Sequence, residues 1–196
     1  MILAADAHYF GSAAMPRGRV AGVLFESWED SSPALASALE RPCSADYEPG
    51  QFFRREMPLL LALLETLDAS GHRPECVVVD GYAWLGGLGP ADARPGLGAH
   101  LWEALGRSIP VVGVAKTRFE GTPSEQEIFR GQSARPLFVS AAGMSQSEAM
   151  RRVASMHGSH RLPTLLARVD RLCRDGVAPP TPPATRAPAF SRRPSS

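Results

Sequence analysis

The chain begins with two short apolar segments separated by a turn. Residues 2–9 read ILAADAHY and residues 19–27 read RVAGVLFES, and each segment is predicted to form a β-strand. The residues between them include glycine and proline, which are typical of a hairpin turn. We therefore expect an antiparallel hairpin at the start of the fold. Residues 34–41 fit either a third strand or a short helix.

A helical pattern follows the hairpin. Between residues 50 and 69 the apolar positions recur with a period of about 3.6 residues, which predicts an amphipathic helix. Pro58 lies inside this pattern and is expected to kink the helix. Residues 74–80, PECVVVD, are then predicted to form a buried strand that ends on Asp80.

The strand–helix–strand order is repeated in the second half of the chain. Residues 81–96 are rich in glycine and proline and predict a long loop, a kind of segment that often carries function. Residues 97–106 predict a helix, and residues 109–116, IPVVGVAK, predict another continuous apolar strand. This order implies parallel strands that are buried on both faces. A last strand is predicted at residues 136–143, followed by two closing helices at residues 145–156 and 162–174.

The composition fits one globular domain followed by a tail. Of the 196 residues, 44% are hydrophobic and 21% are charged, which is ordinary for a globular protein of one domain. After Gly176 the chain is rich in Pro, Ala, Arg and Ser and contains no acidic residue, which is typical of disorder. We predict a domain over residues 1–175 and a disordered tail over residues 176–196. The formal net charge of +1 does not by itself indicate a nucleic-acid partner.

Cysteine usage and hydropathy indicate a cytoplasmic protein. Cys43, Cys76 and Cys173 lie far apart, so they predict neither a disulfide framework nor a cysteine metal site. The N-terminus lacks the features of a signal peptide, and no apolar run reaches transmembrane length. We expect no membrane association. A monomer is also expected, because no exposed apolar stripe requires a partner.

Four acidic residues occupy positions that are locally unusual for an acid. Asp6 interrupts an apolar strand, Glu56 follows two arginines in a helix, Asp80 ends a buried strand, and Asp170 lies on the last predicted helix. Each alone can be explained as a strand end, a surface pair or a charge on a helix face. Together they fit a site for a hard divalent cation, because Mg²⁺ binds oxygen ligands and neutralises carboxylates that would otherwise repel one another. Spacing alone does not show that the four converge.

Several short motifs follow one another along the chain. They are AADAHY with Asp6, DYEPG with Tyr47, Pro49 and Gly50, FFRRE ending at Glu56, VVVDG with Asp80, LGAHL at residues 97–101, GVAK with Lys116, and RLP at residues 161–163 followed by Asp170. This order of motifs resembles the endonuclease V family, a branch of the ribonuclease H-like nucleases. The resemblance covers about residues 2–175. It implies an α/β ribonuclease H-like fold with a mixed central β-sheet, an antiparallel N-terminal hairpin and flanking helices.

The resemblance implies a metal-dependent endonuclease of DNA repair. Asp6, Glu56 and Asp80 would bind Mg²⁺, with Mn²⁺ as an alternative, and Asp170 would be a fourth acid of the site. The reaction would be hydrolysis of a phosphodiester by water near a deaminated base such as hypoxanthine, in DNA or RNA. Lys116 would contact a phosphate or stabilise developing charge. It is the only lysine in the chain, which otherwise uses arginine.

The resemblance also implies roles in substrate recognition. The stretch Tyr47-Glu48-Pro49-Gly50 would form a wedge that separates the strands beside a base rotated out of the helix, with Tyr47 replacing the lost stacking. A turn that caps the next helix is the alternative interpretation of this stretch. The residues implied for the base pocket are Gly81, Tyr82, Leu97, Gly98 and His100.

The chain departs from the family in the loops that would contact substrate. Tyr82 stands where the family usually has a histidine after Asp-Gly, a later His-Pro pair is absent, and Glu48 replaces an apolar residue of the wedge. His8 and His100 are the histidines that could compensate, although His100 also fits a helix residue packed near its loop. A nuclease of the same chemistry with another substrate, and a nucleic-acid-binding protein with weakened catalysis, therefore stay open as alternatives.

Overall fold

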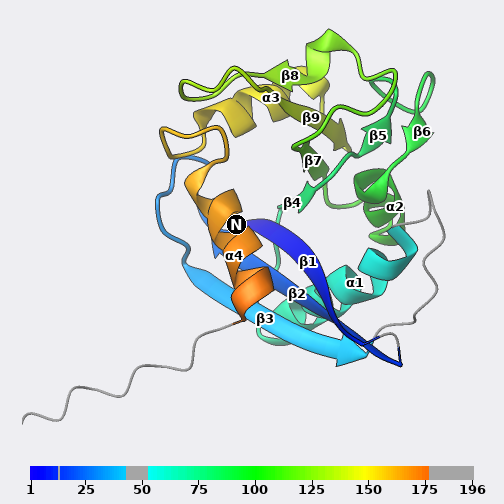
Figure 1. The fold of residues 1–196 in the computed structure, drawn as a ribbon, viewed down its shortest axis with the longest axis vertical. Coiled ribbons are helices and arrows are strands. Elements are labelled where there is room, and N and C mark those ends of the chain that lie inside the picture. Colours follow the sequence, from blue (N-terminus) through cyan, green and yellow to red (C-terminus); the bar gives the residue numbers. More distant parts are fainter. Residues whose placement is uncertain (13, 43–52, 177–196) are drawn as a thin grey trace, which may run out of the picture.

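The computed structural model describes residues 1–12, 14–42 and 53–176, which form a mixed β-sheet with helices on both faces (Figure 1). The sheet has seven strands in the order β3-β2-β1-β4-β7-β9-β8. The α/β fold with a mixed sheet, an N-terminal hairpin and flanking helices is therefore confirmed. None of the helices in these ranges is long and apolar enough to cross a membrane.

An antiparallel hairpin opens the fold, as predicted. It is formed by β1 (Ile2–Ser12) and β2 (Met15–Phe25). The ambiguous segment at residues 34–41 is a strand, β3 (Leu35–Pro42), which pairs antiparallel with β2. Because β3 lies at the edge of the sheet and is partly exposed, its apolar pattern is weak, and pairing with β2 determines its conformation.

The two buried strands of the sequence pattern lie side by side and parallel. β4 (Cys76–Asp80) pairs parallel with β1 on one side and with β7 (Val111–Ala115) on the other. Beyond β7, the sheet continues antiparallel with β9 (Leu137–Ala142) and with the short edge strand β8 (Glu127–Ile128). Parallel neighbours point the same way, so residues near the ends of β4 and β7 meet at one edge.

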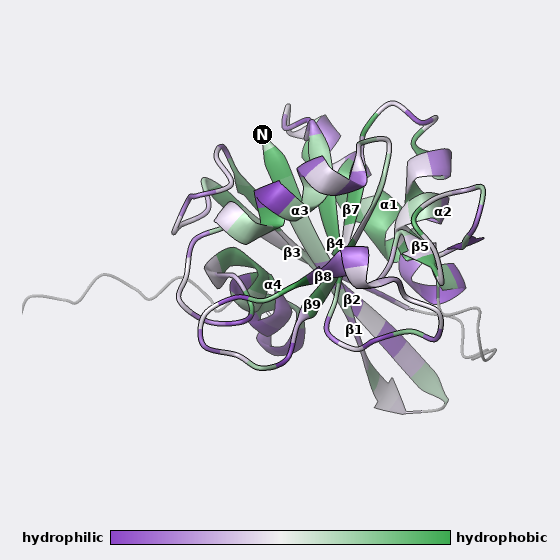
Figure 2. Ribbon diagram, turned by 90° about the horizontal axis from the view of Figure 1, so that it is seen from above, coloured by the Kyte–Doolittle hydropathy of each residue, from purple (hydrophilic) through white to green (hydrophobic). Residues whose placement is uncertain are grey.

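Helices cover both faces of the sheet. Successive strand residues point to opposite faces: Leu3 packs with the leucines of the first helix, and Ala4 packs with apolar residues of the last two. In Figure 2 the central strands are mainly green, whereas purple residues lie on the outer parts of the molecule. The helices are α1 (Phe53–Ala69) and α2 (Leu97–Ala104) on one face, and α3 (Gln146–Ser155) and α4 (Thr164–Asp175) on the other.

The predicted loop at residues 81–96 contains a small sheet of its own. β5 (Trp84–Leu85) pairs with β6 (Arg94–Pro95). Trp84 is buried, and its indole nitrogen donates a hydrogen bond of 2.8 Å to the carbonyl oxygen of Ala141 in β9. The loop is thus fixed to the main sheet. A further 3-10 turn lies at Ser124–Gln126.

Some predictions lie partly or wholly outside the described residues. The predicted helix at residues 50–69 is described from Phe53 onward as α1, with Pro58 inside it. The wedge residues Tyr47, Glu48, Pro49 and Gly50 and the tail after Gly176 are not among the described residues.

Candidate active site

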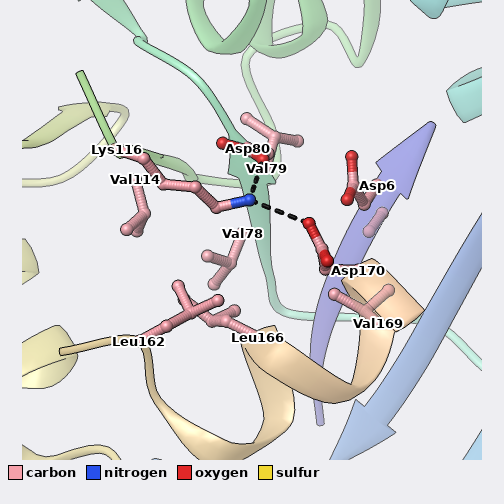
Figure 3. Close-up of a pocket in the computed structure, with 11 residues that line it drawn as sticks. Asp6, Val78, Val79, Asp80, Val114, Lys116, Leu162, Leu166, Val169 and Asp170 are labelled. Atoms are coloured by element: carbon pink, nitrogen blue, oxygen red, sulfur yellow. Dashed lines mark hydrogen bonds and ion pairs between the residues drawn. The ribbon is translucent and has the colours of Figure 1, made fainter. Parts of the chain in front are cut away.

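Three aspartates from distant parts of the chain meet at one end of the sheet. Asp6 lies in β1 and Asp80 is the last residue of β4; the preceding residues, Ala5 and Val79, are paired across these parallel strands. Asp170 lies on α4. This helix packs on the face of the sheet to which the side chains of Asp6 and Asp80 also point. A carboxylate oxygen from each aspartate lies within 4.8 Å of the other two, and Figure 3 shows the three side chains around one space.

Glu56 approaches the same place from the opposite face of the sheet. It lies on α1, and it shares an open depression of about 370 Å³ with the three aspartates. Its side chain is nevertheless buried, with a residue exposure of 8%. Among the described residues, the group of acids with oxygens within 4.8 Å of one another contains the three aspartates and not Glu56. The predicted ligand set of Asp6, Glu56 and Asp80 therefore gathers around one depression, with Asp170 nearer to the two aspartates than Glu56 is.

Burial and mutual repulsion make two of these acids hard to ionise. The pKa of Glu56 is raised to about 8 by desolvation, and further by the charges of Asp6 and Asp80. The pKa of Asp6 is raised to about 6 by desolvation and by Asp80, even though the backbone N–H of Ala7 donates a 2.8 Å hydrogen bond to Asp6 Oδ1. Raised carboxyl pKa values of this kind indicate a site with too little positive charge.

Lys116 supplies part of the positive charge. It follows β7 directly, and its Nζ donates hydrogen bonds to Asp80 Oδ2 at 2.7 Å and to Asp170 Oδ1 at 2.9 Å (Figure 3). Arg174, one turn further along α4, donates to the same Asp170 oxygen at 3.0 Å. Burial acts to raise the Asp170 pKa, but Lys116 and Arg174 outweigh it and hold that pKa below its ordinary value.

Apolar side chains line a small cavity next to the acids. Asp6, Asp80, Lys116 and Asp170 border a small cavity of about 20 Å³, which is room for about one water molecule. Apolar surroundings strengthen electrostatic interactions, so an uncompensated carboxylate is costly here and a nearby positive charge stabilises it. The apolar residues that line the cavity include Val78, Val114, Leu162, Leu166 and Val169.

The donor atoms fit a hard divalent cation. Carboxylate oxygens are the ligands preferred by Mg²⁺ and Mn²⁺. The nearby thiol of Cys173 is a poor soft ligand, because burial raises its pKa to about 12 and keeps it protonated. Its one S–H points to the backbone carbonyl oxygens of Asp6 and Arg19, each 3.1 Å from the sulfur. The acidic cluster could therefore hold a metal ion of the oxygen-preferring class.

The loop after Asp80 passes very close to β7, and two glycines permit this. Gly81 has a φ of +128°, a conformation that favours glycine. A Cβ added to Gly113 would lie 2.5 Å from the backbone nitrogen of Ala83 and 2.6 Å from the carbonyl oxygen of Gly81. Gly113 thus lets the chain turn across β7 immediately after Asp80. It belongs to the GVAK motif, but its role depends on a contact that spacing alone does not reveal.

Tyr82 anchors this loop from inside the protein. Its exposure is 8%, and its ring contacts Phe119 and Phe138. The hydroxyl donates to the carbonyl oxygen of Thr117 at 3.0 Å and accepts from the N–H of Phe119 at 3.1 Å. Tyr82 therefore holds the Asp80 loop to the segment after β7.

The other residues implied for the base pocket occupy different surroundings. Gly81 borders the open depression, and Leu97 lies beside Asp6 and Glu56. Gly98 is buried against Ala83. His100 stacks on Phe53, with ring centroids 3.8 Å apart, and its pKa is lowered by burial. These positions leave Gly81 and Leu97 next to the acids and place Gly98 and His100 in packing contacts.

His8 and Arg174 also line the open depression. His8 lies two residues after Asp6 on β1, so the period of a strand puts both side chains on one face. Arg174 lies four residues after Asp170 on α4, which is the spacing of neighbours on a helix surface. Helical periodicity could have predicted from Asp170 that Arg174 lies beside the site. Only the fold shows which of the two histidines, His8 or His100, lines the depression.

Comparison with known proteins finds relatives of this chain. The Endonuclease V family model matches residues 1–134. The Endonuclease V of Streptomyces coelicolor is 31% identical over 174 residues, which cover 79% of this chain and 70% of that protein. The solved structure of Bacillus subtilis Endonuclease V matches with a TM-score of 0.70 at 18% identity, covering 88% of this chain and 78% of the other.

A second solved structure, of the Ciona intestinalis enzyme, contains nucleic acid. This Endonuclease V is in complex with a 24mer DNA containing an inosine followed by a ribo-adenosine. It matches with a TM-score of 0.65 at 16% identity, covering 88% of this chain and 84% of the other. The matched family model and the relative from Streptomyces, which span most of the described residues, show that the chain belongs to the endonuclease V family.

Proposed function

We propose that the protein is a divalent-metal-dependent endonuclease that hydrolyses a phosphodiester near a deaminated base in nucleic acid. The observation that carries this proposal is the convergence of Asp6, Asp80 and Asp170, whose oxygens lie within 4.8 Å of one another. Family membership gives this cluster its chemical interpretation. The role in repair of deaminated DNA, and the cation Mg²⁺ or Mn²⁺, are parts of the proposal.

The residues of the site divide into two roles. Asp6 and Asp80 would hold the cation, with Asp170 and Glu56 completing the acidic shell from α4 and α1. A cation bound there would polarise a phosphoryl oxygen and lower the pKa of a water molecule. Lys116, at the rim of the open depression, would contact a phosphate oxygen of the substrate and balance the charge that develops on it.

The substrate class is inferred from the relatives. The Ciona enzyme is in complex with DNA that contains inosine, whose base is hypoxanthine. A base that pairs poorly is cheaper to rotate out of a duplex, which would make it accessible to the site beside the acids. DNA and RNA both stay within the proposal, because the described residues include no group assigned to a 2′-hydroxyl.

A second candidate function has one observation in its favour. Tyr82 stands where the family usually has a histidine and is buried as an anchor of the loop. By the resemblance, this loop departs from the family, while the cluster of Asp6, Asp80 and Asp170 is present. A nuclease with the same metal chemistry and a different substrate, such as a flap, a mismatch or a plain single strand, would keep the acids and change the loop.

Cleavage of matched oligonucleotides tests both candidates. The purified protein is incubated with MgCl₂ or MnCl₂ and end-labelled DNA and RNA strands, each with and without one inosine. We expect a cut near the inosine, which is lost on chelation of the metal and falls by at least about a thousandfold in Asp80→Asn, because that change removes a carboxylate ligand. Equal cutting of all strands would favour the second candidate. Binding without cutting in either metal would sink both.

A further inference from the structure

Lys116 occupies the space between two acids that the proposed cation would also use. Its Nζ lies 2.7 Å from Asp80 Oδ2 and 2.9 Å from Asp170 Oδ1, and the ammonium therefore bridges two of the three clustered aspartates (Figure 3). An ammonium group donates up to three hydrogen bonds and carries one positive charge. It is the nearest substitute for a metal ion that a side chain can offer.

A divalent cation and this ammonium group compete for the same oxygens. Mg²⁺ binds carboxylate oxygens at about 2.1 Å and requires nearly ideal geometry. A cation at that distance from Asp80 and Asp170 would face the Lys116 ammonium at close range, and the two positive charges would repel each other strongly in this partly buried place. Both cannot hold the bridging position at once.

The surroundings of Lys116 allow its side chain to leave while its backbone stays. Its carbonyl oxygen accepts a hydrogen bond from Arg161, which also donates to the carbonyl oxygen of Pro136 at 2.7 Å, so the backbone at the end of β7 is fixed. The side chain is 35% exposed and borders the open depression of about 370 Å³. Four flexible methylene groups therefore connect a fixed backbone to an ammonium group with room to move.

We propose that Lys116 is a built-in substitute cation that metal binding displaces into the open depression, where its ammonium group becomes free to bind a substrate phosphate. This inference rests on the proposed function and deepens it. In the metal-free protein the lysine is engaged with Asp80 and Asp170 and offers little to a phosphate. Metal binding would therefore prepare the site for nucleic acid by releasing a positive charge, so the cation binds first and the substrate second.

The chain provides a direct probe, because Lys116 is its only lysine. Protein labelled with ¹³C and ¹⁵N in lysine gives one set of side-chain NMR signals. We expect the ε-methylene signal of the metal-free protein to be broad, with two inequivalent protons, as for an immobilised ammonium group. Titration with MgCl₂ alone, which is diamagnetic, should narrow this signal and move it towards that of a free lysine. The midpoint should agree with that of Mg²⁺ binding measured by calorimetry.

Two variants test the competition without any activity measurement. Lys116→Met should bind Mg²⁺ about fivefold more tightly or better, because no ammonium group has to be displaced. Arg174→Gln is the matched control: it removes a cation that also contacts Asp170, but one that touches a single aspartate. Its effect should be clearly smaller than that of Lys116→Met.

The outcomes separate this inference from the function on which it rests. A wild-type protein that binds Mg²⁺ by calorimetry while the Lys116 signal stays unchanged overturns the displacement and leaves the proposed nuclease intact. Equal tightening in Lys116→Met and Arg174→Gln would also contradict it, by showing a general effect of charge. A protein that binds no Mg²⁺ and no Mn²⁺ overturns both. If Lys116→Met does not fold, the NMR titration of the wild-type protein still decides.

Discussion

At the scale of single residues, the site is defined by acids in unequal surroundings. Glu56 is almost fully buried and its pKa is about 8, whereas Lys116 and Arg174 hold the pKa of Asp170 below its ordinary value. In the metal-free protein, some carboxyl groups of the site, such as Glu56, are therefore protonated, and others, such as Asp170, are ionised. A bound cation would draw the protonated members towards ionisation, because it favours their charged form.

The protonation of Glu56 predicts how stability depends on pH. Burial and the charges of Asp6 and Asp80 raise its pKa from 4.5 to about 8, so between these pH values the folded protein keeps a proton that the unfolded chain has released. The free energy of unfolding should therefore fall as the pH rises through this window, by at most about 1.4 kcal/mol per pH unit for this group.

Glu56→Gln provides the comparison for this effect. Thermal or urea unfolding of both proteins is measured in the presence of a chelator from pH 5 to pH 9. Asp6, with a pKa of about 6, contributes mainly below that pH, so the difference between the two proteins from about pH 6 to 8 reports Glu56. Parallel stability curves for the two proteins over that interval would show that Glu56 is ionised in the folded state.

A second prediction concerns the hydroxyl of Tyr82. Tyr82→Phe removes the donor to Thr117 and the acceptor for the N–H of Phe119, and leaves both backbone groups without this partner in a partly buried place. We expect the free energy of unfolding to decrease by roughly 1–3 kcal/mol. Urea unfolding of the two proteins measures the change, and a difference below about 0.5 kcal/mol would contradict the anchoring role.

At the scale of elements, the site depends on how one loop crosses one strand. The chain turns at Gly81, directly after Asp80, and then passes over β7 at Gly113. This crossing fixes the path of the backbone that follows Asp80. The small β5–β6 sheet and the buried Trp84 then hold the rest of the loop. A loop rich in glycine is therefore firmly attached at its beginning, next to the acid that it follows.

Gly113→Ala should damage this crossing severely. Its Cβ would lie 2.5 Å from the backbone nitrogen of Ala83, and backbone atoms cannot give way as a flexible side chain can. We expect a loss of about 2 kcal/mol or more in the free energy of unfolding, together with weaker Mg²⁺ binding as Asp80 shifts.

The matched control for this change is Gly89→Ala in the same loop. A Cβ at Gly89 meets no atom within 4 Å, so this variant should differ from the wild-type protein by less than about 0.5 kcal/mol. Denaturant unfolding and calorimetry compare the three proteins. Similar results for the two variants would mean that the close crossing over β7 has no importance for the site.

At the scale of the whole molecule, the sequence predicted the elements better than their meeting points. The hairpin, the parallel β4 and β7 and the two closing helices follow from periodicity and from buried apolar runs. The position of Asp170 could not be derived in the same way, because the packing of Leu165, Leu166 and Val169 against the sheet decides which side of α4 faces Asp6. The resemblance to a family predicted that the acids converge. The packing of α4 against the sheet is what brings Asp170 close to Asp6 and Asp80.

The finer errors and omissions have the same origin. β3 was ambiguous because it is a half-exposed edge strand, and β5, β6 and β8 are two-residue strands that have no periodicity to detect. The separation of Glu56 from the three aspartates arises because α1 lies on the other face of the sheet. Pairing of Lys116 with two acids at once likewise depends on three elements meeting in space.

The predicted domain boundary can be tested on the whole molecule. The apolar clusters of the described residues extend from Ile2 to Cys173, so a chain that ends at Gly176 contains all of these contacts. It should unfold at the same temperature as the full chain within about 2 °C, which corresponds to about 0.5–1 kcal/mol for a chain of this size. A clearly lower melting temperature of the shortened chain would show that residues 177–196 belong to the folded domain.

The first strand and the last helix each contribute an aspartate to the same small space. A ribosome delivers Asp6 early and Asp170 near the end of synthesis, so an unfinished chain would carry an incomplete acidic cluster. The cluster of three carboxylates is therefore complete only after α4 has been synthesised and has packed against the sheet, and cleavage of the chain before α4 would detach one of them.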